Sequence, residues 1–552
     1  MMNFSHISVG GGMVGVETII CAINNIESIL KKTKKKIFFN NKKITFAIID
    51  SNPENIPGGV AYGFKSSQYG YFNNPIRLAP LKLKKWISIK KNQNKIIFYL
   101  QKYGSLSGRA WLKKNLGLLK KTNTKSFDEI YFPRVLANLW MEEKIFLLLK
   151  KINYLNRKFS IEINLKFIKG EVISASKQNN GYTKISFRNN KFELLNYKLN
   201  RKKIKSLQLI RKQIIHGNIY SYTQSISLGL PPPIELADTK TLNHINYIRD
   251  FYASGGTANL IKKLLQIFKK KKNKVIKIYF IGYKAGLLEP LSELKYLIND
   301  KQIPIQMICS SSDLLGIEKA EKTFGNKKYN LKFFKSHTIK KINTASKLFN
   351  NIISEFNIAV KNNYNKYDAW TEILNKNILG KCLFNFKSSE IKLYKNSIFY
   401  KIRAVTRFTY PSTIQSRDEL ISNGLLIAKK EKVIKVSNIK NKLFVNVKNN
   451  KNKFGKFFCD LIVNVSGPML ANNLKKEWPV VQSIKNRRVI LTPGGFEVNN
   501  NFSVIGNHNI YIPGFLANSF NPERKTIIKA ILENSEKAGK DIAKKLLMIY
   551  VK

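Results

Sequence analysis

The glycine-rich segment "GGGMVG", residues 10 to 15, constrains the fold of this chain more than any other feature. Residues 4 to 9 before it favour a β-strand, and apolar residues recur at helical spacing after it. Residues 43 to 50, "KITFAIID", then form an apolar run that ends in an acid. Strand, G-x-G-x-x-G, helix, strand and acid in this order predict a βαβ unit that binds a dinucleotide.

The residue types in this turn suit the binding of a dinucleotide. We expect Gly10 to permit the tight turn, Gly12 to let the backbone approach a pyrophosphate, and Gly15 to let helix and strand pack closely. Gly11 belongs to the same ligand-binding turn, and the helix N-terminus presents free N–H groups to the phosphates. Asp50 is expected to accept hydrogen bonds from a ribose diol. The alternative is a glycine-rich turn without a ligand.

The spacing of the acid departs from the usual pattern. Asp50 lies thirty-five residues after Gly15, whereas about twenty is usual. The extra residues are concentrated in "KKTKKKIFFNNKK", residues 31 to 43, for which we predict an extended helix end and a surface loop. Lysines at the end of a helix suit the negative end of its dipole.

The stretch that follows the acid, "SNPENIPGGVAYGFKSSQYGYFNNPIRLAPLKLKKWI", carries phrases in a characteristic order. It resembles the FAD/NAD(P)-binding oxidoreductase family that is distantly related to flavin-containing and N-hydroxylating monooxygenases. The residues that match the family pattern are Asp50, Gly59, Ala61, Tyr62, Asn73, Pro75, Trp86 and Ile87. Later segments that resemble further landmarks are "IYFPRVLANLW" with Pro133 and Arg134, "LGLPPP" (228–233), "NYIRDFYASGG" (246–256) and "CDLIVNVSGP" (459–468).

The resemblance implies a bound FAD. Its adenosine would lie on the turn of residues 10 to 15 and on Asp50, and Gly59, Tyr62 and Asn73 would approach the flavin. Without the resemblance, "GGVAYG" is only a mobile turn, and residues 73 to 75 are a common loop phrase. Both interpretations stay open.

A second unit of the same design begins at "VIKIYFIG", residues 275 to 282. Gly282 and Gly286 bound its turn, and an amphipathic helix and the strand "IPIQMIC" follow. The resemblance implies NADP or NAD here. However, Lys284 stands in place of the middle glycine and no acid ends the strand, although the serines at 310 to 312 offer partners for a 2′-phosphate. The alternative is a unit that keeps its fold and binds nicotinamide weakly or not at all.

The C-terminal segment predicts a strand, a turn at Gly514 and a long helix with Pro522 and Glu523 in its first turn. The resemblance implies that Gly514 contacts the cofactor and that this helix points its N-terminus at the flavin ring; the alternative is a packing helix. The strand before "GLPPP" is identified as "LIRKQIIHG", with His216 as a loop residue rather than a catalyst.

The fold class predicted for the whole chain is α/β, with two Rossmann-like, three-layer dinucleotide-binding units, a small antiparallel β insertion and a helical segment. Five segments are expected. They are 1–170, the first part of the FAD-binding unit; 171–270, a β-rich insertion and connection; 271–345, the NAD(P)-type unit; 346–440, a mainly helical covering segment; and 441–552, the return to the FAD domain with the C-terminal helix.

The net charge of +63 would ordinarily suggest a nucleic-acid partner. Only 14 of the 97 basic residues are Arg, and Lys, Asn and Ile abound throughout, so we attribute the charge to an AT-rich genome. Non-specific binding to polyanions is expected as a by-product. Neither the four cysteines nor the five histidines show metal-ligand spacing, and no segment predicts a membrane span or signal peptide. The expected location is the cytoplasm.

The sequence therefore predicts an FAD-dependent oxidoreductase, a monooxygenase or oxidase that acts on a small or carrier-bound metabolite. The flavin supplies the difficult chemistry, so no catalytic residue has to be visible, and none is named. Two alternatives stay open: an RNA-associated, tRNA-modifying flavoprotein, and an FAD-binding protein that has lost turnover. The pattern indicates neither a substrate nor an oligomeric state.

Overall fold

The computed structural model of the chain divides into two compact units, each built from separate segments. It describes residues 2–550 except 33–42, 64–68, 121–127, 160, 200–206, 230, 273, 284, 313, 315–317, 324–327, 470, 472–473, 475–477, 485–488, 493 and 518–526. Unit 1 comprises Met1–Phe64, Val135–Pro231 and Leu470–Lys552. Unit 2 comprises Lys65–Arg134 and Pro232–Met469.

Unit 1 is organised around a sheet whose central strands are parallel, in the order β21-β8-β1-β2-β3. These strands are β1 (Met2–Val9), β2 (Lys43–Asp50), β3 (Glu162–Lys169), β8 (Ile219–Ile226) and β21 (Asn507–Tyr511). Strand order reverses beside β1, because β2 and β3 lie on one side of it and β8 on the other. In sheets of this kind ligands bind at the carboxyl ends of the strands at such a reversal.

Antiparallel strands extend this sheet. They are β4 (Val172–Lys177), β5 (Thr183–Phe187), β6 (Lys191–Leu199), β7 (Leu207–His216) and β20 (Ser503–Val504). The predicted antiparallel β insertion is thus present, as β4 to β7. Further short elements of the unit are α2 (Gly59–Tyr62), α17 (Pro479–Ile484), β18 (Leu491–Thr492) and β19 (Gly495–Phe496).

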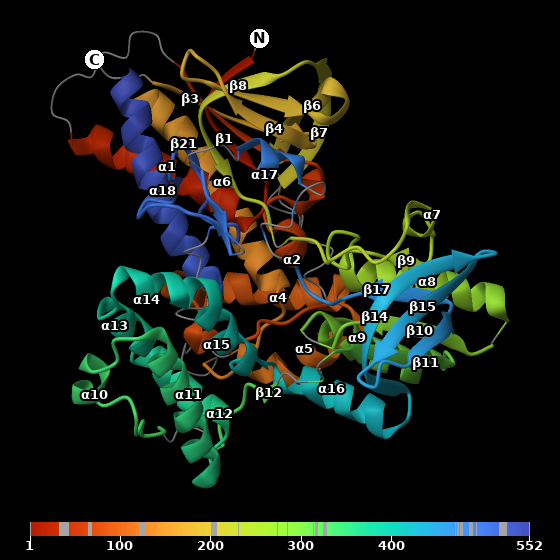
Figure 1. The fold of residues 1–552 in the computed structure, drawn as a ribbon. Coiled ribbons are helices and arrows are strands. Elements are labelled where there is room, and N and C mark those ends of the chain that lie inside the picture. Colours follow the sequence, from red (N-terminus) through yellow and green to blue (C-terminus); the bar gives the residue numbers. More distant parts are fainter. Residues whose placement is uncertain are drawn as a thin grey trace. The chain divides into compact units, whose positions relative to one another are not determined.

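Three long helices lie side by side in unit 1: α1 (Met13–Lys32), α6 (Val135–Phe159) and α18 (Ile527–Tyr550), as Figure 1 shows. The packing of α1 on α18 is tight, because a Cβ placed on Gly539 would lie 2.6 Å from Cβ of Cys21. Of the described helices, only α1 has the length and apolar composition that crossing a membrane requires, and 67% of that apolar window is buried in the fold.

Unit 2 contains a second parallel sheet in the order β14-β11-β10-β17-β9. Its strands are β9 (Tyr247–Ile248), β10 (Ile276–Ile281), β11 (Ile305–Ser311), β14 (Leu426–Ile439) and β17 (Leu461–Asn464). One face packs against α8 (Gly256–Lys271), α9 (Ala285–Lys301) and α16 (Pro411–Ser422). The other face packs against the continuation of β14 with β15 (Lys442–Asn449) and β16 (Phe454–Cys459). This unit therefore has three layers.

The rest of unit 2 is mostly helical and includes a separate hydrophobic core. The helices around that core are α10 (Ser336–Lys340), α11 (Ala345–Lys361), α12 (Lys366–Asn375), α13 (Ile378–Phe384), α14 (Ser388–Leu393) and α15 (Phe399–Val405). The other elements are α3 (Leu81–Ser88), α4 (Lys90–Tyr103), α5 (Leu106–Leu119), α7 (Thr239–Leu242), β12 (Glu318–Lys319) and β13 (Phe408–Thr409).

The predicted fold class is confirmed: the chain is α/β and has two Rossmann-like units, each built on a parallel sheet. The two compact units nevertheless group the segments differently from the five predicted ranges. Residues 65 to 134 belong to unit 2 rather than to the first Rossmann unit, and the return to unit 1 comes at residue 470 rather than 441. The reason is that β14, β15 and β16 complete the second sheet before the chain leaves it.

The strand beside β1 was wrongly assigned from the sequence. The segment before "GLPPP" that pairs with β1 is β8, "IYSYTQSI", whereas "LIRKQIIHG" belongs to the edge strand β7. His216 is the last residue of β7 and is exposed, so it lies in a strand end rather than in a loop.

Candidate functional site

The turn between β1 and α1 consists of three glycines, because β1 ends at Val9 and α1 begins at Met13. Gly10 has a φ of +103°, and a Cβ there would lie 2.7 Å from the carbonyl oxygen of Ser227 at the end of β8. Both the backbone conformation and the contact exclude a side chain. The chain therefore turns sharply at the reversal of strand order.

Gly15 lets α1 lie close to the strand ends. A Cβ on Gly15 would lie 2.2 Å from the carbonyl oxygen of Gly10 and 2.3 Å from Oγ of Ser8. The first turn of α1 thus rests directly on the end of β1. Its first N–H groups have no acceptor within the helix and, with the helix dipole, form an environment that favours an anion.

The segment after β2 forms the opposite wall of this turn. A Cβ on Gly12 would lie 3.3 Å from Cα of Gly59, and one on Gly11 would lie 2.4 Å from Cγ1 of Ile56. Gly59 has a φ of +68° and opens the short helix α2, which ends at Tyr62. The structure therefore brings the two glycine phrases of the sequence together within unit 1.

Asp50 is tied to the turn through its carboxylate. Oδ2 accepts a hydrogen bond of 2.8 Å from the N–H of Gly11, and Oδ1 accepts one of 2.8 Å from the N–H of Asn52. Burial raises the pKa of Asp50 above its ordinary value, although these two hydrogen bonds act in the opposite direction. Each oxygen keeps a further lone pair, so the carboxylate can still accept hydroxyl groups of a ribose.

One further described residue belongs to the surroundings of the turn. Gly514 lies beside the first turn of α1, where its Cβ would be 3.4 Å from the side chain of Val14. The predicted helix start at Pro522 and Glu523 lies outside the described residues, and α18 is described from Ile527.

Ser227 is a site residue that the sequence did not indicate. It is buried, and its hydroxyl has no hydrogen-bond partner in the described part of the chain. Cβ of Ser227 would lie 3.2 Å from a Cβ on Gly15, so the hydroxyl group belongs to the wall of the turn. Correct assignment of β8 would have revealed it, because the residue that follows a strand beside β1 lies at the ligand end of the sheet.

The turn of unit 2 repeats the geometry of unit 1. The N–H of Gly282 donates to the carbonyl oxygen of Ser310 at 2.8 Å, just as Gly10 donates to Ile49 at 2.8 Å. Gly282 has a φ of +115°, and its Cβ would lie 2.7 Å from Cα of Ser466. Lys284, which stands in place of the middle glycine, lies outside the described residues.

The unit 2 turn also differs from its counterpart in two ways. Gly286 is less tightly enclosed than Gly15, because its Cβ would lie 3.2 Å from the carbonyl oxygen of Val465. In addition, continuing the pairing of β1 with β2 by one residue sets Asp50 beside Gly10, and continuing that of β10 with β11 sets Ser311 beside Gly282. A hydroxyl therefore replaces the carboxylate that would accept a ribose diol.

Two basic residues belong to the surroundings of this second turn. Lys430 pairs with Ser311 across β14 and β11. The guanidinium of Arg417, on α16, lies 5.6 Å from the ring centre of Tyr283, the residue after Gly282. The side chain of Arg417 is only 13% exposed. The same guanidinium forms an ion pair with Asp418, with Nη2 lying 2.7 Å from Oδ1.

Arg134, one of the residues that resemble the family pattern, forms a buried ion pair in unit 2. Its Nη1 lies 2.8 Å from Oε2 of Glu289 on α9, and its Nε donates to the carbonyl oxygen of Tyr71 at 3.0 Å. Arg134 thus ties the segment of residues 70 to 73 to α9. Asn73 is half-buried in this segment and belongs to unit 2, unlike Gly59 and Tyr62.

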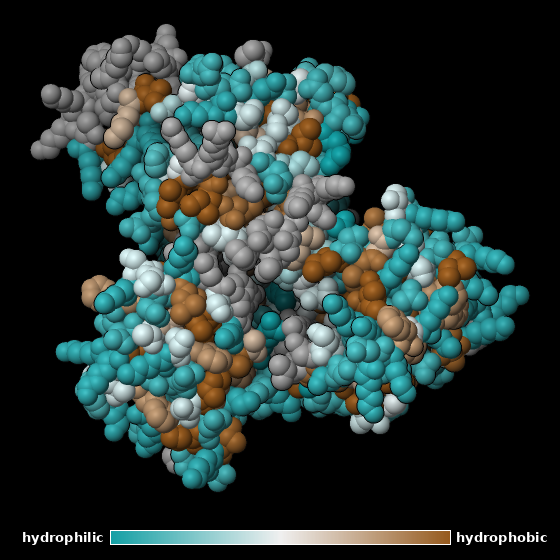
Figure 2. All heavy atoms as spheres, in the orientation of Figure 1, coloured by the Kyte–Doolittle hydropathy of each residue, from teal (hydrophilic) through white to brown (hydrophobic). Residues whose placement is uncertain are grey.

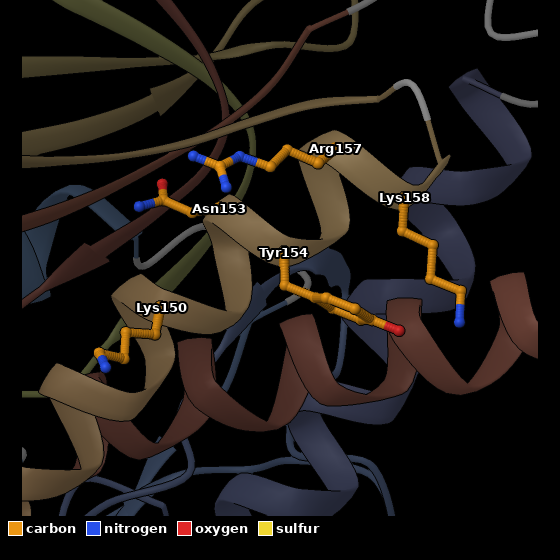
Figure 3. A pocket seen from close by; sticks show the side chains of 5 residues that line it. All are labelled: Lys150, Asn153, Tyr154, Arg157 and Lys158. Atoms are coloured by element: carbon orange, nitrogen blue, oxygen red, sulfur yellow. The ribbon is translucent and has the colours of Figure 1, made fainter.

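A surface pocket lies elsewhere in unit 1, on the second half of α6. Its lining residues are Lys150, Asn153, Tyr154, Arg157 and Lys158 (Figure 3). None of them belongs to the glycine turn, and all of them come from one helix. Among the described residues no group of three His, Cys, Asp or Glu side chains is placed to hold a metal ion.

No protein-family model and no curated protein matches the sequence. Solved structures are similar in fold. The ornithine N-hydroxylase of Kutzneria sp. 744, solved with reduced FAD, NADP+ and L-ornithine, has a TM-score of 0.46 at 10% identity, with 98% of this chain and 99% of that chain covered. The bacillithiol disulfide reductase of Staphylococcus aureus has a TM-score of 0.42 at 10% identity, with 100% and 99% covered.

A third similar structure is the thioredoxin reductase of T. acidophilum, with a TM-score of 0.41 at 10% identity and 99% of both chains covered. These solved structures are an N-hydroxylase and two reductases. The similarity extends over whole chains and concerns the fold.

Proposed function

We propose that this chain is an FAD-dependent oxidoreductase that holds FAD in unit 1. The observation that carries the proposal is the arrangement of Gly10, Gly12 and Asp50 at the reversal of strand order. Side chains are excluded from the turn, a helix N-terminus faces it, and a carboxylate is fixed beside it. These are the features that a pyrophosphate and an adenosine ribose require.

The residues present fit this cofactor. The N–H groups at the start of α1 would hold the pyrophosphate, and Asp50 would accept the ribose hydroxyls. Gly59 would line the other side of the ligand, with Tyr62 and Gly514 nearby, and Asn73 is proposed for the flavin side on the resemblance alone. When bound, FAD supplies the transfer of electrons between a reductant and an acceptor.

We propose that NADPH, rather than NADH, serves as the reductant where a nicotinamide is used. Ser311 cannot replace the carboxylate that selects a free ribose, whereas Arg417 and Lys430 suit a 2′-phosphate. The alternative is a unit 2 that keeps its fold and has lost nicotinamide binding through Lys284. In that case the chain is an FAD-binding protein that depends on another reductant or has lost turnover.

The reaction we propose is oxygenation or oxidation of a small or carrier-bound metabolite. Its chemistry would rest with the flavin, so the protein has only to bind the cofactor, orient the substrate and exclude water. A tRNA-modifying flavoprotein is the second candidate. It is favoured by the contacts between basic and aromatic side chains on β15 and β16, Lys448 with Phe454 and Lys456 with Phe444.

The test is to purify the full chain, release its cofactor and identify it by mass and absorbance, then follow its reduction. FAD that is reduced faster by NADPH than by NADH supports the complete proposal. FAD that neither nicotinamide reduces supports the alternative for unit 2. Protein that stays colourless after incubation with FAD contradicts the proposed function itself.

A further inference from the structure

The antiparallel meander β14-β15-β16 of unit 2 has two contrasting faces. On β15, Leu443, Val445 and Val447 are buried against the parallel sheet. The alternate residues of β15 and β16 point away from this core, because successive side chains of a strand lie on opposite faces. The outward face is accessible, since Phe454 is 76% exposed and Phe458 39% exposed.

Three cross-strand rows make up this outward face, which we call the meander face. From one end to the other they are Lys432, Lys448 and Phe454; Lys435, Asn446 and Lys456; and Ser437, Phe444 and Phe458. A row with two lysines thus separates the aromatic pair at one end from Phe454 at the other. In Figure 2 the part of unit 2 that carries β14 and β15 shows hydrophobic spheres interspersed with hydrophilic ones.

The aromatic rings and ammonium groups of the meander face are in contact. Nζ of Lys456 lies 4.5 Å from the ring centre of Phe444, and Nζ of Lys448 lies 5.6 Å from that of Phe454. The rings of Phe444 and Phe458 lie 5.8 Å apart. Rings and cations therefore lie side by side on this sheet.

The meander itself supplies few acids to neutralise these lysines, although Asp238, at the start of α7, interacts with Lys435. Residues 426 to 459 contain ten lysines and one acid, Glu431. Glu431 lies in phase with the buried Val433. Burial raises the pKa of Tyr279 and Glu431 adds to this rise, so Glu431 belongs to the inner face. Lys432 pairs directly with Lys448, and like charges opposite each other destabilise a sheet. A bound polyanion would relieve this repulsion.

We propose that the meander face binds single-stranded nucleic acid. Phe444, Phe454 and Phe458 would stack on bases, and the lysines between them would contact phosphates, which is the combination that sequence-tolerant single-strand binding uses. A lipid surface fits less well, because lysines interrupt the apolar side chains. This inference is independent of the proposed flavin chemistry, since it concerns another surface and can be tested whether or not FAD binds.

The experiment measures binding of the full-length protein to fluorescent oligouridine and to polyphosphate, an anion without bases. In the first variant, Phe454→Ala and Phe458→Ala, the expected affinity for oligouridine falls about tenfold or more while that for polyphosphate changes less than about twofold. Both side chains are exposed, so the variant is expected to fold, which its thermal melting curve checks.

A second pair of variants separates this face from the general basicity of the chain. Lys435→Gln, Lys448→Gln and Lys456→Gln remove three cations from the meander face, and Lys150→Gln, Arg157→Gln and Lys158→Gln remove three from α6. The slope of log Kobs for oligouridine against log salt concentration is about 0.7 per neutralised phosphate, so the first set is expected to reduce this slope by about 2. The α6 set is expected to reduce it by clearly less.

Equal reductions of the salt-dependence slope in the meander-face variant and the α6 variant would overturn the proposal, because they would show binding by net charge alone. It would also be overturned by equal losses of oligouridine and polyphosphate in the phenylalanine variant. A third contrary result is binding to vesicles with phosphatidylserine that exceeds binding to oligouridine and disappears in the same variant, since that result identifies a membrane as the partner.

Discussion

The N–H of Gly11 donates a 2.8 Å hydrogen bond to Oδ2 of Asp50, so the glycine turn and the acid thirty-nine residues later form one structural element. The carboxylate fixes the turn from which the phosphates would be bound. At the same time it presents the acceptor that a ribose needs. Cofactor affinity and the shape of the turn therefore depend on the same side chain.

Replacement of Asp50 by Asn is expected to lower the affinity for FAD about tenfold or more. Only one of the two oxygens remains, so an N–H of Gly11 or Asn52 loses its acceptor, and hydrogen bonds to a charged group contribute about 1.5–3 kcal/mol. Titration of the apoprotein with FAD measures the change. Glu54→Gln removes a nearby exposed carboxylate and is the control, and equal effects of both variants would contradict the role given to Asp50.

The pH dependence of FAD binding should also reflect Asp50. Because burial raises the pKa of this carboxyl group, the group becomes protonated at a higher pH than an ordinary aspartate as the solution is acidified. Affinity for FAD is thus expected to decrease on acidification while the protein is still folded. The same titration in Asp50→Asn should be flatter over that range, and a parallel decrease in both proteins would point to another group.

Alanine substitutions at Gly15 and Gly286 should have unequal effects. The Cβ of Gly15→Ala would lie 2.2 Å from the carbonyl oxygen of Gly10, whereas that of Gly286→Ala would lie 3.2 Å from the oxygen of Val465. We expect Gly15→Ala to lower the free energy of unfolding of unit 1 by about 3 kcal/mol or more, and Gly286→Ala to cost about 1 kcal/mol or less. Denaturant unfolding tests this order, and the reverse order would contradict the close packing at Gly15.

His6 should make unit 1 less stable in acid. It is fully buried between Thr223, at 2.9 Å, and Ser225, at 3.3 Å, and burial lowers its pKa from 6.5 to about 3. The unfolded chain therefore binds a proton below pH 6.5 that the folded chain does not. The stabilisation present above pH 6.5 is lost as the pH falls towards 3, by at most about 1.4 kcal/mol per pH unit.

Urea unfolding between pH 4 and pH 8 measures this slope. His6→Gln, which does not titrate, should show a smaller decrease in the free energy of unfolding below pH 6.5 than the native chain. His216→Gln, at the exposed end of β7, serves as the control. Identical slopes for the native chain and His6→Gln would exclude His6 as the cause.

Removal of the Arg417 guanidinium should affect one nicotinamide more than the other. With Arg417→Ala we expect the KM for NADPH to rise about tenfold or more and the KM for NADH to change less than about twofold, since only NADPH carries the 2′-phosphate. Steady-state reduction of the flavin gives both values. A similar rise for both would indicate that Arg417 acts through the packing of Tyr283 instead.

The glycine turn could be predicted because its determinants are local: Gly10, Gly15 and the strands around them stand close together in sequence. The strand that pairs with β1 on its other side, β8, could not be predicted in this way. Ser221, Thr223 and Gln224 of β8 are buried but polar, and they are accommodated by hydrogen bonds such as Gln224 Nε2 to Thr183 Oγ1 at 3.1 Å. The order of the family's landmarks instead led to "LIRKQIIHG", which belongs to an edge strand.

The meander face escaped prediction for a related reason. Alternation on β15 and β16 predicts strands, but the alignment of Phe444 with Phe458 and of Lys432 with Lys448 depends on the register between strands. The composition did not indicate the meander face either, because lysines are frequent in every segment of this chain. Only the register shows which lysines and aromatic rings meet.

The packing of α1 against α18 also has a consequence for synthesis of the chain on the ribosome. The apolar α1 is made long before its covering helix, which does not begin until Ile527. At 5–20 residues per second the intervening chain takes roughly 25 to 100 seconds to make. During that interval α1 lacks its final covering, and all segments of unit 2, which ends at Met469, are made before the last segment of unit 1.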